Sequence, residues 1–357
     1  MPSANGGQFL MRCAGPAFVR RVLLAIVSLS CVAAACGNAG RGAEAFYRGK
    51  QIRLIAGFPV GNDYDVGARL LVKYLPKYIP GAPAVIVQNM PQAASVAAVN
   101  YLYAQAPRDG TVFGSFSRNI VNDALTGEPN VRVDPRRLIW LGATSHPARV
   151  CVRRSDAPVK TPADLFTHEM IVSAGGASSS LAIVPTVLNK VLHTKFRIVE
   201  GYNGMGDSIL AAVRGESQGV CASYGQFRIV DQLIREGKLV FLLRAEEAPI
   251  PEIPDVPSIF DYAKTDEQRA LMRFAFASTE FGRPYAFPPG VPQDRVSVIR
   301  KAMADAAHDP QLLAEASRAK LDMTYTPPEM LERLVAKLYE TPPALVAAIK
   351  SILPNEK

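Results

Sequence analysis

The sequence has 357 residues and a formal net charge of +8, and 48% of its residues are hydrophobic. This length is sufficient for two domains of ordinary size. The basic residues are scattered among acidic ones and form no run, so we expect no nucleic-acid partner. After residue 45, no apolar stretch of the sequence is long enough to cross a membrane.

The first 45 residues have the composition of an export signal. Arg12, Arg20 and Arg21 precede an uncharged stretch of 14 residues, 22–35, which is shorter than the roughly 20 residues of a membrane-spanning helix. We expect cleavage after Ala45; the alternative is a lipoprotein signal in which Cys36 carries a lipid anchor. In both cases the folded part would be periplasmic. With cleavage after Ala45 its charge falls to +5, because four arginines and one glutamate are removed.

Two of the five cysteines, Cys151 and Cys221, follow the signal region. An exported protein can oxidise such a pair to a disulfide. Each cysteine lies in an apolar, strand-like run, where a free thiol packs as a small hydrophobic group. We therefore expect two free, buried cysteines, with a disulfide as the alternative.

Residues 52–58 (IRLIAGF) form an almost unbroken apolar run, which is typical of a strand buried on both faces of a parallel sheet. Apolar residues at helical spacing then predict a helix that Asp65 caps. A strand at 84–88, a helix capped by Ser95 and a strand at 111–117 follow. This order predicts a βαβαβ unit.

A second α/β unit is predicted downstream. Its expected strands are residues 170–174, 196–202, 219–223 and 239–245, and its expected helices are residues 181–192, 208–214 and 227–236. Prolines are dense between residues 250 and 290, which indicates rigid connections back to the first unit. The last 65 residues have the pattern of helices packed on that unit, one of them starting at Asp294.

Two such units in series predict an α/β fold of two doubly wound lobes around a ligand cleft. We assign residues 1–45 to the signal peptide, 46–147 and 250–357 to lobe 1, and 148–249 to lobe 2.

Three loops follow a strand and open a helix: residues 58–65, 89–95 and 173–180. A helix N-terminus exposes unpaired N–H groups and about half a positive charge, so converging loops can hold a carboxylate without an arginine. The alternative is that the glycines and serines of these loops serve only turns and caps.

Five segments spread along the chain have an unusual composition: FYRGKQIRLIAGFPVGNDYD, VIVQNMPQAASVAAVNYLY, APRDGTVFG, GRPYAFPPGVPQDRV and DPQLLAEA. Together they resemble the substrate-binding subunits of tripartite tricarboxylate transporters, the TctC or Bug family of periplasmic receptors. The resemblance implies the type II periplasmic-binding-protein fold, with two lobes that close over a ligand. It also implies that residues 58–65 and 91–95 grip one carboxylate of the ligand through backbone groups and ordered water.

The chain departs from the family pattern at both loops. Where the family commonly has PPGGGYD, residues 59–65 are PVGNDYD, and where it often has PGAGS, residues 91–95 are PQAAS. Lost glycines restrict positive φ angles and close backbone approach. Asp63 adds a negative charge that would repel a carboxylate, unless it points away or meets a positive group on the ligand. We therefore hypothesise a ligand other than plain citrate, with an amino or amide group or with only one carboxylate.

The residues expected to contact the ligand lie in these loops and at strand ends: Phe58, Gly61, Asn62, Asp63, Tyr64, Asp65, Gln92, Ala93, Ser95, Ser117, Gly175, Gly176, Ser178, Ser179, Ser180, Gly204 and Asp207. Asp65 and Asp207 are interpreted first as helix caps.

An enzymatic role has little support in the sequence. No Ser lies in a G-x-S-x-G elbow, the four histidines are isolated, and no G-x-G-x-x-G or P-loop pattern occurs. A nucleophilic Cys151 near His146 would rest on residue types alone. We expect no catalytic residue, no metal and no cofactor.

The sequence thus predicts a monomeric extracytoplasmic receptor that captures a small organic carboxylate by closing its lobes. The resemblance implies delivery to a membrane permease of large and small subunits. The alternative is a sensor that presents its ligand to a membrane signalling system.

Overall fold

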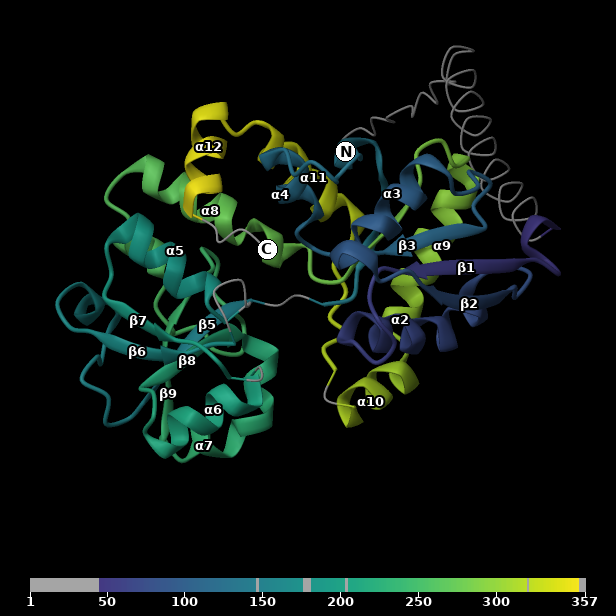
Figure 1. The fold of residues 1–357 in the computed structure, drawn as a ribbon. Helices are drawn as coiled ribbons and strands as arrows, with labels where there is room; N and C mark the ends of the chain where they lie inside the picture. Colours follow the sequence, from purple (N-terminus) through teal and green to yellow (C-terminus); the bar gives the residue numbers. More distant parts are fainter. Residues whose placement is uncertain (1–44, 146–147, 176–180, 203–204, 320, 353–357) are drawn as a thin grey trace, which may run out of the picture.

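Two five-stranded sheets organise the molecule (Figure 1). The computed structural model describes residues 45–145, 148–175, 181–202, 205–319 and 321–352, so Cys36 and nearly all of the expected signal lie outside it. Sheet A has the order β2 (Ala84–Asn89), β1 (Gln51–Ala56), β3 (Val112–Ser115), β10 (Pro284–Phe287) and β4 (Ile139–Ala143). Sheet B has the order β7 (Phe196–Val199), β6 (Met170–Ser173), β8 (Gly219–Ser223), β5 (Arg149–Arg154) and β9 (Leu239–Arg244).

The expected βαβαβ unit forms the parallel part of sheet A. β1 pairs in parallel with β2 and β3. Ile52 and Leu54 of β1 pack into one hydrophobic core, and Ile55 packs into another core on the opposite face of the sheet. The strand is therefore buried on both faces, as its continuous apolar run predicts.

Both sheets are mixed, because each of the two α/β lobes that we expected includes an antiparallel strand. β10 lies antiparallel between β3 and β4, and β5 is antiparallel to both β8 and β9. The sequence signal for β10 is weak because this strand has four residues and starts with a proline. The fold nevertheless belongs to the α/β class that the sequence predicts.

Helices cover both faces of sheet A and both faces of sheet B (Figure 1). Those that pack around sheet A are α2 (Asp63–Tyr74), α3 (Val96–Ala104), α4 (Ile120–Thr126), α9 (Gln293–Ala307), α10 (Pro310–Arg318) and α11 (Pro328–Tyr339). Those next to sheet B are α5 (Ile183–Leu192), α6 (Met205–Arg214) and α7 (Asp231–Arg235). The expected helix at 227–236 is shorter than predicted, since residues 224–230 form a tighter 3₁₀ turn before α7 begins.

The proline-rich region 250–290 contains more than connections, contrary to the sequence prediction. It includes α8 (Asp266–Glu280), a helix of 15 residues, as well as β10. α8 contacts α5 next to sheet B and α4 and α11 next to sheet A, and α12 (Pro343–Ile352) contacts α4, α5 and α8. Residues 266–280 and 343–352 therefore connect the two halves of the molecule.

Cys151 and Cys221 form a disulfide, so the expectation of two free thiols is wrong. The two residues are directly opposite each other on the antiparallel strands β5 and β8. Both are fully buried. Strand propensity alone could not reveal this, because the pairing depends on β5 and β8 being neighbours in the sheet.

No helix within the described ranges is both long enough and apolar enough to span a bilayer.

Candidate functional site

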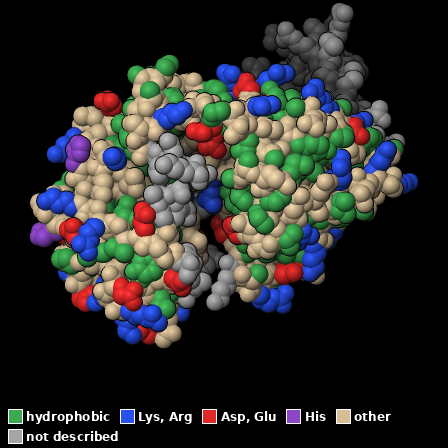
Figure 2. Space-filling view, viewed as in Figure 1, with side chains coloured by type: hydrophobic (Ala, Val, Ile, Leu, Met, Phe, Trp, Pro, Cys, Tyr) green, Lys and Arg blue, Asp and Glu red, His purple; other side chains and the backbone are tan. Residues whose placement is uncertain are grey.

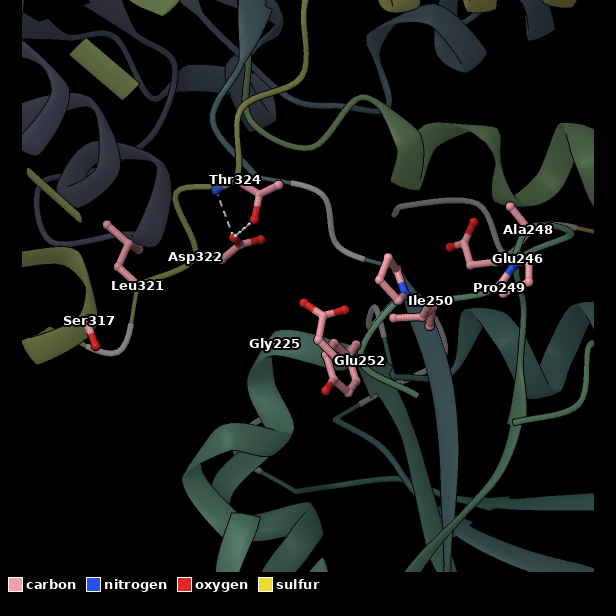
Figure 3. A pocket seen from close by; sticks show the side chains of 13 residues that line it. Gly225, Glu246, Ala248, Pro249, Ile250, Glu252, Ser317, Leu321, Asp322 and Thr324 are labelled. Atoms are coloured by element: carbon pink, nitrogen blue, oxygen red, sulfur yellow. Dashed lines mark hydrogen bonds between the residues drawn. The ribbon is translucent and has the colours of Figure 1, made fainter. Parts of the chain in front are cut away.

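A pocket of about 490 Å³ opens between the segment that follows β9 and the segment that follows α10 (Figure 3). The space-filling view shows the surface hollowed between the two halves (Figure 2). The lining residues are Ala148, Tyr224, Gly225, Glu246, Ala248, Pro249, Ile250, Pro251, Glu252, Ser317, Leu321, Asp322 and Thr324. Its size is that of a site for a small organic molecule. Among the residues that the structure describes, the charged ones that line it are all acids: Glu246, Glu252 and Asp322.

The loop between β1 and α2 satisfies its backbone donors with its own side chains. Asn62 is the N-cap of α2, and its side chain accepts a hydrogen bond of 3.0 Å from the N–H of Tyr64. Asp65 accepts one of 2.9 Å from the N–H of Gly61, so Asp65 lies inside the helix and is not the expected cap. Two backbone donors at the start of α2, those of Gly61 and Tyr64, are therefore already bonded to acceptors of this chain.

Asp65 is the centre of this loop. It is buried, and it also accepts hydrogen bonds from Arg69 (3.0 Å) and from the Asn89 amide (2.7 Å) at the end of β2. Burial alone would raise the pKa of Asp65, but these hydrogen bonds and that from Gly61 lower it overall. Asp65 is thus an ionised residue that ties the loop to β2, rather than a group free to contact a solute.

Tyr64 and Phe58 lie together beneath the loop, with ring centroids 4.2 Å apart. Tyr64 is 6% exposed, and its hydroxyl donates to the carbonyl of Gly282 over 3.2 Å. The same oxygen accepts a hydrogen bond of 3.2 Å from Nε of Arg118. The aromatic pair therefore positions an arginine that follows β3.

Arg118 lies close to a second arginine, Arg149, at the start of β5. Arg149 is 2% exposed, and burial followed by the positive charge of Arg118 lowers its pKa to about 9. The Nη1 atom of Arg118 is buried and has no hydrogen-bond partner among the described residues. An arginine that follows a strand of sheet A and an arginine of sheet B thus lie close enough to interact electrostatically.

Glu246 connects this arginine pair to the pocket. Its Oε1 accepts a hydrogen bond of 3.0 Å from the backbone N–H of Arg149, and it lines the pocket. Burial raises the pKa of Glu246 to about 7, although the hydrogen bond from Arg149 opposes the shift. Near neutral pH this side chain can therefore be either a carboxylate or a neutral hydrogen-bond donor.

Asp63 forms an ion pair within the chain, so it does not require a positive group on a ligand. Its carboxylate lies 3.5 Å from Nη1 of Arg283, which is 3% exposed. Nη2 of Arg283 donates to the carbonyls of Thr144 (2.8 Å) and Asp322. The negative charge that the sequence places beside the anion site is thus partly neutralised by a buried arginine of the same chain.

The loop before α3 keeps a left-handed backbone without glycine. Ala93, Ala94 and Ser95 have φ angles of 51°, 47° and 76°, a region in which residues with a Cβ are strained. We expected the side chain of Ser95 to cap α3. Ser95 is at the N-cap position, but its side chain makes no capping hydrogen bond. Its hydroxyl oxygen instead accepts a hydrogen bond of 2.7 Å from the N–H of Ser117. This loop therefore has a strained left-handed backbone at residues that are not glycine.

The other residues that we expected to contact the ligand do not form a cluster with these loops. Gln92 is exposed, and Asp207 is exposed in the first turn of α6. Gly175 accepts a backbone hydrogen bond of 3.0 Å from Gly201. The remaining candidates, Gly176, Ser178, Ser179, Ser180 and Gly204, lie outside the described residues.

Arg118, Arg149 and Glu246 are functional candidates that the sequence reasoning missed. Arg118 comes directly after the predicted strand 111–117, so its strand-end position was an available signal. The other two could not be found, because their approach depends on how the two sheets face each other. Within the described ranges, no group of three or more His, Cys, Asp and Glu side chains is placed to hold a metal ion.

Solved structures with the same architecture are known. The chain has the fold of TctC solute-binding proteins. A TctC solute-binding protein from Polaromonas, solved without ligand, is 19% identical with a TM-score of 0.67, over 85% of this chain and 99% of that one. MatC from Rhodopseudomonas palustris, with bound malate, is 18% identical with a TM-score of 0.53, over 85% and 99%.

A third structure, an R. palustris protein with adipate, is 16% identical with a TM-score of 0.55, over 86% of this chain and 99% of that one. No protein-family model and no curated protein matches the chain. The two-lobed periplasmic-binding fold predicted from the sequence resemblance is confirmed.

Proposed function

We propose that this chain is a periplasmic receptor of the TctC/Bug type that captures a small organic carboxylate in the cleft between its two lobes. The observation that carries the proposal is the pocket of about 490 Å³ between the two halves, together with the buried Arg149, whose neighbour Ala148 lines the pocket, and the half-buried Arg118. A pair of arginines close to the pocket would provide the positive charge that an organic acid needs.

The structural neighbours favour the same ligand class. One was solved with malate and another with adipate, both small carboxylic acids. The described wall of the pocket on the side of sheet A is Ser317, Leu321, Asp322 and Thr324, and the wall on the side of sheet B includes residues 246 and 248–252. Residues 58–65 and 91–95 are not among the described lining residues, and we propose that they extend the wall on the side of sheet A when a solute is bound. We propose the division into lobes as 46–147 with 250–357, and 148–249.

Capture would proceed by closure of the lobes around the solute. A ligand drives closure only through its higher affinity for the closed state. The closed receptor would then deliver the acid, chemically unchanged, to a membrane permease. Export would follow from the signal at residues 1–45, whose composition is that of a secretory peptide.

Isothermal titration of the mature protein with malate, adipate and citrate, extended to a wider panel of organic acids, tests the proposal. We expect at least one acid to bind with micromolar or tighter affinity, and to be recovered unaltered after prolonged incubation. Failure of every acid to bind, or recovery of a converted product, would exclude the receptor function. Native mass spectrometry of gently purified protein would identify a co-purified solute directly.

A further inference from the structure

We propose that the cleft selects a solute with a single carboxylate, which Arg118 binds beside Arg149, and with a remainder that is neutral or positively charged. This inference rests on the proposed function and names the ligand class of the same site. It follows from three features. Arg118 is held in a fixed orientation and has a buried N–H donor without a partner among the described residues. Two backbone donors of the neighbouring loop are already hydrogen-bonded, and acidic residues line the pocket.

The first feature is the orientation of Arg118. Its Nε is held 3.2 Å from the hydroxyl oxygen of Tyr64, which is itself fixed to the carbonyl of Gly282. Nη1 of Arg118 is buried without a partner among the described residues. A buried charged donor without an acceptor is costly, and a ligand carboxylate would supply that acceptor.

The proximity of Arg149 adds to this cost. Two guanidinium groups of like charge lie close enough for Arg118 to depress the pKa of Arg149. An anion placed between them would reduce their mutual repulsion. We therefore expect a bound carboxylate to stabilise Arg118 beside Arg149.

The second feature is the state of the loop between β1 and α2. Its Gly61 N–H is bonded to Asp65 and its Tyr64 N–H to Asn62. Donors that are already satisfied offer little to an incoming anion. Charge recognition in this chain thus shifts from the backbone of the loop to the side chain of Arg118.

The third feature is the acidic lining of the pocket. Glu246, Glu252 and Asp322 line it, and no lysine or arginine is among its lining residues within the described part of the chain. In Figure 3, the carboxylate of Glu252 points into the space between the two walls. A second carboxylate on the solute would meet these acids at close range and be repelled. An ammonium, amide or hydroxyl group would instead find acceptors there.

A series of acids with a constant carbon skeleton tests this selectivity. Glutarate carries two carboxylates, pentanoate one, and 5-aminopentanoate one carboxylate and one ammonium. The four- and six-carbon counterparts of each acid control for length. For the skeleton that fits, we expect calorimetry to rank the amino acid or the monocarboxylate above the dicarboxylate by about tenfold or more.

Variants of the charged residues test which side chain binds the carboxylate of the solute. R118Q removes one charge-assisted hydrogen bond and should weaken the best monocarboxylate about 10- to 100-fold. R118K, which keeps the charge but loses the planar fork, should recover part of this loss. R197Q is the matched control, because Arg197 is an exposed arginine on β7; it should change no affinity. E252Q should improve binding of glutarate relative to pentanoate.

The outcomes separate this inference from the proposed function. If an acid binds the wild type but R118Q binds it within twofold, or if dicarboxylates bind tightest at every length, the inference fails and the receptor function stands. If no acid of any type binds, the proposed function fails and the inference with it. Retention of the wild-type circular dichroism spectrum and melting temperature by R118Q shows that the variant is folded.

Discussion

The hydroxyl oxygen of Ser95 accepts a hydrogen bond of 2.7 Å from the backbone N–H of Ser117. The bond joins the loop before α3 to the segment after β3. Gly57, at the end of β1, packs against the same residue so closely that a Cβ on Gly57 would lie 2.4 Å from the Cβ of Ser95. Three segments of sheet A therefore meet at Ser95, and this junction holds the neighbouring alanines in their strained conformation.

Replacing Ala94 by glycine should stabilise the protein. Ala94 has φ 47° and is exposed, so its side chain adds strain without adding packing. We expect A94G to raise the free energy of unfolding by about 0.5–1 kcal/mol. A97G, in the first turn of α3, should lower it by a similar amount, about 0.5–1 kcal/mol, because glycine is less favourable than alanine in a helix. Urea denaturation measures both, and equal destabilisation by the two variants would contradict the strain at position 94.

Removing the disulfide should have a much larger effect. Cys151 and Cys221 are separated by 70 residues in the sequence. Because the bond restricts the unfolded chain, the C151A/C221A variant should lose roughly 4 kcal/mol of stability. Chemical denaturation with and without reductant provides the comparison. Reductant alone should leave the folded protein oxidised, since both sulfur-bearing residues are fully buried; stability of the double variant equal to that of the wild type would refute the prediction.

The sequence predicted those parts of the fold that depend on local pattern. The apolar run of β1 and the helical spacing that follows it are properties of neighbouring residues, and both elements are found. β10 was missed because its four residues acquire their strand character from β3 and β4 on either side. The disulfide was missed for the same reason, since the pairing of β5 with β8 brings its two cysteines together.

The candidate site shows a similar division. The sequence correctly indicated that the loops after β1 and β2 lie next to each other, and Asn89 donates a 2.9 Å hydrogen bond to the carbonyl of Phe58. It could not show that Asp65 and Asn62 occupy the donors of the first loop. Nor could it show Arg149 beside Arg118, because these residues belong to different sheets. Contacts within a unit follow from spacing, whereas contacts between units require the docked structure.

The Asp63–Arg283 pair should be asymmetric in its contribution to stability. Asp63 is largely exposed and the ion pair is long, at 3.5 Å, so D63N should cost less than about 1 kcal/mol. Arg283 is buried and donates to the Thr144 and Asp322 carbonyls, so R283M should cost roughly 2–4 kcal/mol by leaving both acceptors unpaired. Thermal and urea unfolding distinguish the two variants. Acid affinity that improves more than about threefold in D63N would mean that Asp63 repels the ligand despite its partner.

Glu246 should make the stability of the protein depend on pH near neutrality. Its pKa is about 7 in the folded state against 4.5 for an unperturbed glutamate. The folded state thus binds the proton more tightly than the unfolded state does, so the contribution of Glu246 is most favourable at low pH and is lost as the pH rises from about 4.5 through 7. E246Q cannot ionise, and its amide oxygen can still accept the hydrogen bond from the N–H of Arg149.

We therefore expect E246Q to match the wild type near pH 4.5 and to become more stable than it as the pH rises. The difference should reach about 2–3 kcal/mol at pH 8. E252Q, which changes an exposed acid of the same pocket, is the control and should follow the wild-type curve. Urea midpoints measured from pH 4 to 9 provide the test. Parallel curves for E246Q and the wild type would show that Glu246 is ionised at neutral pH, and that the arginine pair already has its counter-ion.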